Sequence, residues 1–177
     1  MLTKRAKATA GTIAALTAGV LALSAGPASA SGTYSGLAYV YGAGVFIDDW
    51  NNEGIVDQSH NTSSNATCLW QTILWSDGFL GTGDIDGIFG SDTANATRQW
   101  QNAWTDDTPD GSAGQITWTA AGRFLYNETE THTGNTVSYY DGSLHDFALS
   151  RDSNGYYHFY DSTGADRAAG YNYRTCS

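Results

Sequence analysis

The sequence is poor in basic residues. Only 8 Lys and Arg stand against 18 Asp and Glu among 177 residues, and three of the eight, Lys4, Arg5 and Lys7, fall within the first 30 positions. Residues 31–177 therefore carry a formal charge of 5 − 18 = −13 and contain no lysine. A surface of that charge repels nucleic acid and anionic lipid, so we expect no nucleic-acid or membrane partner held by bulk charge.

Long apolar runs are absent after residue 30. The one such run, Ile13 to Leu23, is too short for a typical transmembrane helix. It follows a positively charged start and precedes the small-residue stretch Ala28-Ser29-Ala30, and no cysteine stands there to carry a lipid anchor. This order is typical of a secretory signal peptide, which we predict over residues 1–30. We therefore expect secretion, and a mature chain of 177 − 30 = 147 residues.

Cysteine is almost absent, with Cys68 and Cys176 as the two examples. Because a secreted chain folds in an oxidising compartment, the two cysteines are predicted to form a disulfide. The alternative is that Cys176 is a catalytic nucleophile with a histidine partner. No known catalytic signature surrounds Cys176, so the disulfide is the favoured interpretation.

The sequence does contain an eight-residue motif, called the phrase below, that occurs twice between residues 65 and 125. The copies Asp86–Thr93 and Asp110–Thr117 both fit D-G-x-x-G-x-x-T. Asp-Gly favours a tight turn, because Gly tolerates positive φ and Asp can bond downstream amides. Both copies end on residue types that occupy helix N-termini. The phrase therefore predicts a loop that leads into a helix, used twice.

Helical periodicity predicts three helices, Asn65 to Gly78, Asp92 to Trp104 and Ile116 to Leu125. Asn65 is the expected N-cap of the first helix, and Gly78 is a C-cap signal. Trp70, Trp100 and Trp118 are either core residues or a platform for a ligand. Large aromatics dominate small cores, so burial is the favoured interpretation of all three.

The flanks of the two phrases complete a recognisable order. Trp70-Gln71 and Gly78-Phe79 precede the first copy, Trp100-Gln101 lies between the copies, and Trp118 follows Thr117. This order resembles the three-helix peptidoglycan-binding-like family. The sequence departs from the family at Trp70 and Trp100, where Leu and Phe are usual. The resemblance implies a three-helix peptidoglycan-binding-like core over residues 65–125.

The resemblance also implies a binding site for peptidoglycan, either its glycan or its stem peptide. Helix N-termini favour carboxylates, and aromatic side chains favour sugar faces. Gln101 is expected to project into a surface groove beside Thr93. The alternative is that the site residues only define the loops and the core. The implied ligand-binding residues are Phe89, Gly90, Thr93, Trp100, Gln101, Thr117 and Trp118.

The remaining segments read as short strands. Residues 31–64 are predicted to form a hairpin, with Leu37 to Tyr41 paired to Val45 to Ile47, followed by a linker. Residues 126–177 are predicted to form an antiparallel meander, in which Phe147, Leu149, Tyr157 and Phe159 share one face. The expected strands are Thr136 to Tyr140, Leu144 to Leu149, Tyr156 to Tyr160 and Tyr171 to Thr175. Together the segments predict an α+β fold.

No sequence motif indicates a metal site. His132, His145 and His158 are far apart in the sequence, without a compact His-x-His or His-x-x-Glu-His pattern. The pair Asp48-Asp49 lacks a spaced third ligand and is predicted to lie in a solvated turn. We therefore expect no metal ion and no cofactor.

Catalytic residues are equally hard to assemble. Glu128 and Glu130 are candidate glycosidase acids, but they lie in an Asn/Thr-rich segment predicted to be a solvated linker. Only 177 − 125 = 52 residues follow the predicted helical unit, which is too few for most catalytic folds. We therefore predict a secreted, extracellular or cell-wall-associated, monomeric, non-catalytic protein that binds peptidoglycan. The alternatives are an extracellular interaction protein with the same fold and no peptidoglycan affinity, and a cell-wall hydrolase or its accessory.

Overall fold

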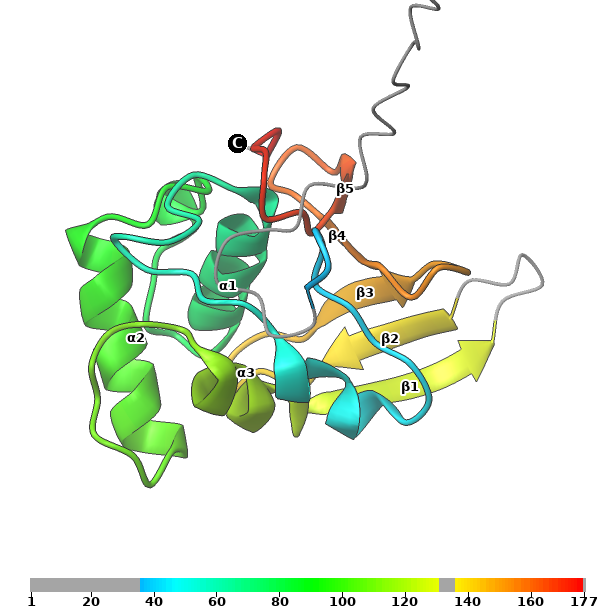
Figure 1. Cartoon of the computed structure of the whole chain (residues 1–177), viewed down its shortest axis with the longest axis horizontal. Coiled ribbons are helices and arrows are strands. Elements are labelled where there is room, and N and C mark those ends of the chain that lie inside the picture. The colour runs from blue at the N-terminus through cyan, green and yellow to red at the C-terminus, as the bar shows by residue number, and fades with distance from the viewer. Residues whose placement is uncertain (1–35, 131–135, 177) are drawn as a thin grey trace, which may run out of the picture.

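The computed structural model describes residues 36–130 and 136–176, and it places α-helices on one side of the molecule and an antiparallel sheet on the other (Figure 1). The predicted α+β class is confirmed. The expected signal peptide and His132 lie outside the described residues. The helices are η1 (Phe46–Asn52), α1 (Asn65–Ser76), η2 (Thr82–Asp84), α2 (Ser91–Trp104) and α3 (Gln115–Gly122). The strands are β1 (Leu125–Glu130), β2 (Thr136–Tyr140), β3 (Phe147–Arg151), β4 (Tyr157–Tyr160) and β5 (Asp166–Ala168).

Helix α1 has a side-chain cap at its start and a glycine stop at its end. Ser64, one residue before the predicted cap, is the N-cap, and its Oγ accepts a hydrogen bond from the Thr67 amide at 3.0 Å. At the other end Gly78 has a φ of +81°, which an L side chain rarely adopts. The amide of Phe79 donates to the carbonyl of Leu74 at 2.8 Å, the 6→1 bond of a Schellman stop.

Helices α2 and α3 start in the same way. Each follows directly on the second glycine of its phrase, and the backbone is extended at both Gly90 (φ −88°) and Gly114 (φ −95°). Both starts lie one residue before the predicted ones. Helix α3 ends at Gly122 rather than at Leu125, because Leu125 is already the first residue of β1.

The sheet is a meander in which each strand pairs antiparallel with the next, in the order β1-β2-β3-β4-β5. Leu149 of β3 lies opposite Phe159 of β4, and both are buried together with Tyr157. His158 is half-buried and Tyr160 is exposed, so the predicted division of β4 into an inner and an outer face is confirmed.

Two expectations for the C-terminal region are wrong. The predicted linker that contains Glu128 and Glu130 is strand β1. The predicted strand from Tyr171 to Thr175 is not a strand, and Asp166–Ala168 pairs with β4 instead. The reason lies in Asn65 of α1, whose Oδ1 accepts the backbone amide of Thr175 at 2.8 Å and so holds this segment against the helix.

The predicted N-terminal hairpin is also wrong. Phe46 and Ile47 start the 3-10 helix η1 and so do not form a return strand. Tyr39 bridges to Gly170 and Tyr41 bridges to Tyr156, so the N-terminal segment completes the sheet region through long-range contacts. The sequence pattern predicts local pairing, whereas the partners lie near the other end of the chain.

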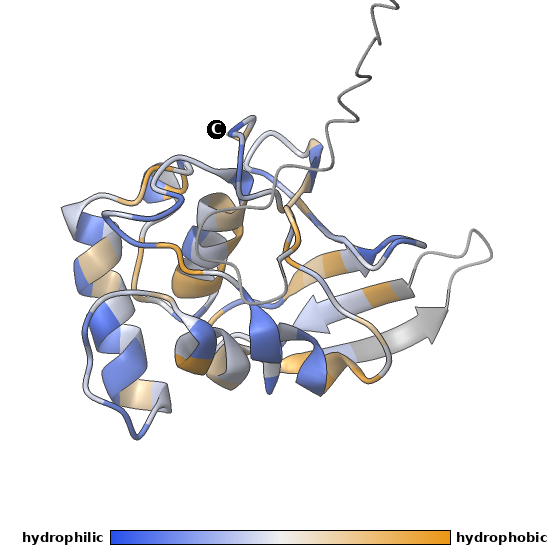
Figure 2. Cartoon of the chain, in the orientation of Figure 1, coloured by the Kyte–Doolittle hydropathy of each residue, from blue (hydrophilic) through white to orange (hydrophobic). Residues whose placement is uncertain are grey.

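A chain of buried aromatics connects the helices to the sheet. Trp70 contacts Trp100 and Trp118 edge-on, with ring centroids 5.2 and 5.3 Å apart. Trp118 in turn contacts Trp50 of η1 at 5.4 Å, and Trp50 stacks on Tyr140 of β2. All five side chains are fully buried, so the favoured core role of Trp70, Trp100 and Trp118 is confirmed. In Figure 2, α1 carries strongly apolar residues whereas α2 is mainly hydrophilic.

Asp77, the C-cap of α1, adds a polar junction to this core. Its Oδ2 accepts hydrogen bonds from Trp100 Nε1 at 2.7 Å and from the Tyr140 hydroxyl at 2.8 Å. Its Oδ1 accepts the Ser143 amide at 2.8 Å. The buried carboxylate of Asp77 therefore has hydrogen-bond donors for both of its oxygens. These bonds connect helix α2, strand β2 and the loop that contains Ser143.

The predicted disulfide is present between Cys68 of α1 and Cys176. It joins the helical side to the C-terminal segment across 108 residues of chain. Within the described part of the chain, no helix combines the length and the apolar character needed to cross a membrane.

Candidate functional site

The loop before α2 is held by a glutamine of the preceding helix. Gln71 Nε2 donates to Asp86 Oδ1 at 3.0 Å, to the Ile88 carbonyl at 3.1 Å and to Thr93 Oγ1 at 3.1 Å. Gln71 Oε1 accepts the amide of Gly87 at 2.7 Å. Because the glutamine is buried, these bonds fix the loop and the first turn of α2 together.

The loop before α3 is held by the same arrangement. Gln101 Nε2 donates to Asp110 Oδ1 at 2.8 Å, to the Ser112 carbonyl at 3.0 Å and to Thr117 Oγ1 at 3.0 Å. Gln101 Oε1 accepts the amide of Gly111 at 2.9 Å. The repeated sequence phrase is therefore a repeated structural unit, in which a glutamine binds the Asp-Gly turn and the threonine of the next helix.

The glycine of each turn is required by its conformation. Gly87 and Gly111 have φ of +73° and +81°. A Cβ at Gly87 would also lie 2.7 Å from the sulfur of Cys176, and one at Gly111 would lie 2.9 Å from the carbonyl of Ala94. These glycines serve the turn and its packing, as the loop interpretation predicted.

Burial leaves little of the predicted ligand-binding set available to a ligand. Each of these side chains lies in the core or in a glutamine-centred cluster, although Gln101 and Thr117 also line a hollow of about 270 Å³. Gly90 is the half-buried exception. The buried members are Phe89, Thr93, Trp100, Gln101, Thr117 and Trp118.

The expectation for Gln101 is corrected in a specific way. Its side chain is 4 % exposed and does not project beside Thr93. Gln71 is the residue that contacts Thr93, and Gln101 contacts the equivalent Thr117. Both Trp-Gln dipeptides are visible in the sequence. Which threonine each glutamine contacts depends on how the helices pack, and this the sequence does not show.

A groove does lie beside the second repeat, between the C-terminal end of α2 and α3. We call it groove A. Its volume is about 480 Å³, and a second hollow of about 270 Å³ shares Thr105, Asp107, Gln115 and Ile116 with it. The walls of groove A include Trp104, Thr105, Asp107, Gln115, Ile116 and Arg123.

Groove A combines exposed apolar surface with one cation. The Trp104 side chain is 38 % exposed and Ile116 is 59 % exposed, although both are large apolar residues. The Trp104 ring meets Phe124 edge-on at 5.1 Å, which fixes its orientation. Arg123 is exposed and makes no ion pair with any of the side chains that the structure describes, those of residues 36–126 and 137–176. Such a surface suits a ligand with an apolar face and a negative group.

The sequence contained weaker signals for these wall residues. Trp104 is the last residue of the second predicted helix. Ile116 and Arg123 carry no motif signal and become recognisable only when α3 packs beside the end of α2. On α1, Trp75 stacks on His145, with ring centroids 4.6 Å apart.

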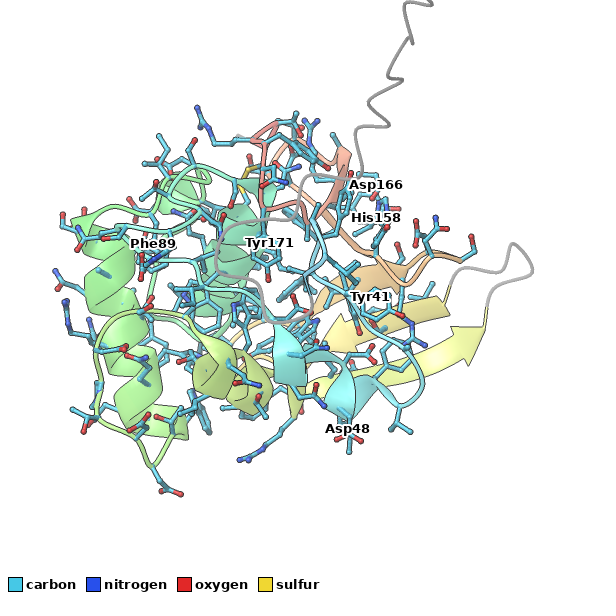
Figure 3. All side chains as sticks on the ribbon, in the orientation of Figure 1. Tyr41, Asp48, Phe89, His158, Asp166 and Tyr171 are labelled. Atoms are coloured by element: carbon cyan, nitrogen blue, oxygen red, sulfur yellow. A yellow bond between two sulfur atoms is a disulfide. The ribbon has the colours of Figure 1, made fainter. Side chains whose placement is uncertain are left out.

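The histidines that were considered as metal ligands have separate partners. His145 stacks on Trp75, whereas His158 lies beside Asp166 on β4 and β5, with Nδ1 3.3 Å from the carboxylate (Figure 3). Across residues 36–130 and 136–176, no three His, Cys, Asp or Glu side chains are grouped so that they could hold a metal ion.

Two carboxylates are buried under the N-terminal segment. Glu53 Oε1 accepts the Tyr41 amide at 2.8 Å, and its Oε2 accepts the Tyr171 hydroxyl at 2.7 Å. Burial raises the pKa of Glu53 to about 8, although these hydrogen bonds act to lower it. Asp49 is paired with Arg151 at 2.7 Å, so the predicted solvated turn at Asp49 is wrong. Burial raises the pKa of Asp49 as well, against the effects of Tyr157 and Arg151.

The carboxylate cluster ties segments together and offers no opening to a substrate, because Glu53 has no exposed surface and Asp49 almost none. Tyr171, which is labelled near the centre of Figure 3, is fully enclosed with them. Groove A is therefore the described feature that best combines access with chemically distinct walls. The chain shows no match to any protein-family model, to any curated protein sequence or to any solved structure.

Proposed function

We propose that this chain is a secreted, non-catalytic protein that binds the peptidoglycan of a bacterial cell wall through groove A. The observation that carries the proposal is the half-exposed Trp104 beside Ile116 and the unpaired Arg123, on the loop-helix unit that resembles the peptidoglycan-binding-like family. Peptidoglycan offers sugar rings with apolar faces and stem peptides with carboxylates. Each of these has a chemical counterpart in the groove.

The indole of Trp104 supplies the sugar contact in this proposal. Its polarised ring packs against the C–H face of a sugar, and Ile116 extends the apolar surface on the opposite wall. The edge contact with Phe124 holds the indole in place before a ligand arrives. Preorganisation of this kind reduces the entropy that binding costs.

Arg123 supplies the electrostatic contact. Its guanidinium is free of protein ion pairs in the described structure and can donate to a stem-peptide carboxylate in a bidentate geometry. Asp106 and Asp107 line the same groove and disfavour ligands with dense negative charge, such as phosphate polymers. The groove thus favours a neutral glycan with isolated carboxylates.

Co-sedimentation with purified, insoluble peptidoglycan tests the proposal. The parent protein should sediment with the wall, and Trp104→Ala should weaken binding roughly 3- to 10-fold, which corresponds to about 0.6–1.4 kcal/mol. Tyr160→Ala removes an exposed aromatic side chain on β4, which does not line groove A, and serves as the control. Failure of the parent to sediment favours the interaction-protein alternative, and progressive solubilisation of the wall favours a hydrolase.

A further inference from the structure

The first repeat forms a groove of its own, which we call groove B. It lies between the loop after α1 and the outer face of α2, and its volume is about 500 Å³. Four of its wall positions on α2 correspond to wall positions of groove A on α3 and its C-cap when the two copies of the phrase are aligned. The pairs are Asp92 with Ile116, Asn95 with Thr119, Ala96 with Ala120 and Gln99 with Arg123.

The correspondence means that groove B is not an accidental surface depression. The glutamine clusters around Gln71 and Gln101 set α2 and α3 in the same way relative to their loops, so the same helix face lines each groove. A small residue forms the floor in both, Ala96 in groove B and Ala120 in groove A. The repeat has therefore produced two related grooves on one scaffold.

The two grooves differ in charge. Groove A has Arg123 where groove B has the neutral Gln99, and it has Ile116 where groove B has Asp92. Asp84 of η2 adds a second exposed carboxylate to groove B, and no basic residue lines it. The nearest arginine in sequence, Arg98, is not a wall residue and donates to Asn95 Oδ1 at 2.9 Å. Groove B is thus a polar, acidic version of groove A.

We infer that groove B binds a primary ammonium group carried on an aliphatic stem, as found on diamino acids of wall peptides. This inference rests on the proposed function, because it assigns a second part of the same ligand. Asp84 and Asp92 would contact the ammonium group, and Phe79 and Leu80, both half-buried on the wall, would pack against its methylene stem. The formal charge of −13 over residues 31–177 adds long-range attraction for a cation.

The grooves open on different sides of α2. At 100° per residue, the direction of Trp104 is turned by roughly 120° from that of Asp92, so the two grooves face different directions. Groove A and groove B therefore hold separate segments of the wall. Two such contacts on one rigid body raise the apparent affinity for an insoluble network above that of either alone.

Wall acetylation tests groove B. Acetic anhydride converts the free ammonium groups of purified peptidoglycan into neutral amides and leaves the carboxylates unchanged. The parent should bind the acetylated wall about 5- to 10-fold more weakly than the native wall. The double variant Asp84→Asn, Asp92→Asn should bind both walls equally, at the level of the parent on acetylated wall. The double variant Asp48→Asn, Asp141→Asn changes the net charge equally at exposed positions outside both grooves and should behave as the parent.

The outcomes separate the two proposals. If the parent binds native and acetylated walls equally, or if the Asp84, Asp92 variant keeps the preference for native wall, the assignment of groove B is wrong while peptidoglycan binding stands. If the parent binds neither wall, the proposed function fails. Groove B is then judged by an NMR titration with Nα-acetyl-lysinamide. Amide shifts at Asp92 and Gln99, absent with the Nε-acetylated compound, support it, and their absence overturns it.

Discussion

Gln71 and Gln101 stand in the same relation to the helix that follows each of them. Each side-chain amide donates to the aspartate of an Asp-Gly turn and to a threonine in the first turn of the next helix. The separation in sequence between glutamine and aspartate is 15 in the first repeat and 9 in the second, so the second connection is shorter. The same glutamine contacts form in both repeats although the connections differ in length. The contacts, and not the loop length, therefore define the repeat.

Truncation of either glutamine should destabilise the fold. Gln71→Ala and Gln101→Ala each leave a buried glycine amide without its partner, at a cost of roughly 1–3 kcal/mol in the free energy of unfolding. Urea denaturation measures this change. Gln58→Ala, at an exposed position, should stay within about 0.5 kcal/mol of the parent. An unchanged midpoint for Gln101→Ala would return that residue to the exposed role the sequence suggested.

The buried Glu53 should make stability depend on pH. Burial raises its pKa from 4.5 to about 8 in the folded protein, so between these values the unfolded chain has released a proton that the folded chain retains. The contribution of Glu53 is therefore fully present below pH 4.5 and is lost as the pH rises toward 8. The slope for one proton is about 1.4 kcal/mol per pH unit. Asp49, whose pKa is also raised, acts in the same direction.

Glu53→Gln isolates this effect. The variant cannot ionise, so its free energy of unfolding should fall less steeply between about pH 5 and pH 8 than that of the parent, measured by urea denaturation at each pH. Asp48→Asn removes an exposed carboxylate within η1 and should leave the slope unchanged. Parallel curves for the parent and Glu53→Gln would mean that Glu53 is already ionised in the folded state.

The elements that could be predicted from the sequence are those with local causes. The helix starts after Gly90 and Gly114 follow from the repeated phrase, and the inward face of β3 and β4 follows from alternation of Leu149, Tyr157 and Phe159. The disulfide followed from having two cysteines in a chain expected to be secreted. These signals act over a few residues or need no knowledge of the packing.

The predictions that failed concern features that depend on contacts between distant parts of the sequence. Tyr41 pairs with Tyr156, and Asn65 holds Thr175, so neither the N-terminal hairpin nor the last strand could be corrected without the tertiary contacts. Groove A was missed for the same reason, since Trp104 and Arg123 meet only after α3 packs beside α2. The conspicuous residues of the repeated phrase build the scaffold, and the candidate binding surface is made by less conspicuous neighbours.

Loss of the disulfide should lower stability without altering the groove. The bridge closes a loop of 108 residues, and the chain-entropy model gives up to about 4–5 kcal/mol for a loop of that length. The double variant Cys68→Ser, Cys176→Ser should therefore unfold at lower urea concentration. Under conditions where it is folded, it should still sediment with peptidoglycan, because groove A lies on α2 and α3. Labelling of two free thiols in the native parent would contradict the bridge itself.

Arg123 should make binding depend on the carboxylates of the wall. Amidation of those carboxylates with a carbodiimide and ammonia removes the negative group that Arg123 is proposed to bind. The parent should lose roughly 3- to 10-fold in affinity on amidated wall, equivalent to about 0.6–1.4 kcal/mol, whereas Arg123→Gln should bind native and amidated wall equally. Arg98→Gln removes the same charge from an exposed position outside groove A and should keep the preference for native wall.

An Arg123→Gln variant that still distinguishes the two walls would place the carboxylate contact elsewhere. Loss of binding by Trp104→Ala on both walls, in the same series, would then leave groove A as a site for the glycan alone.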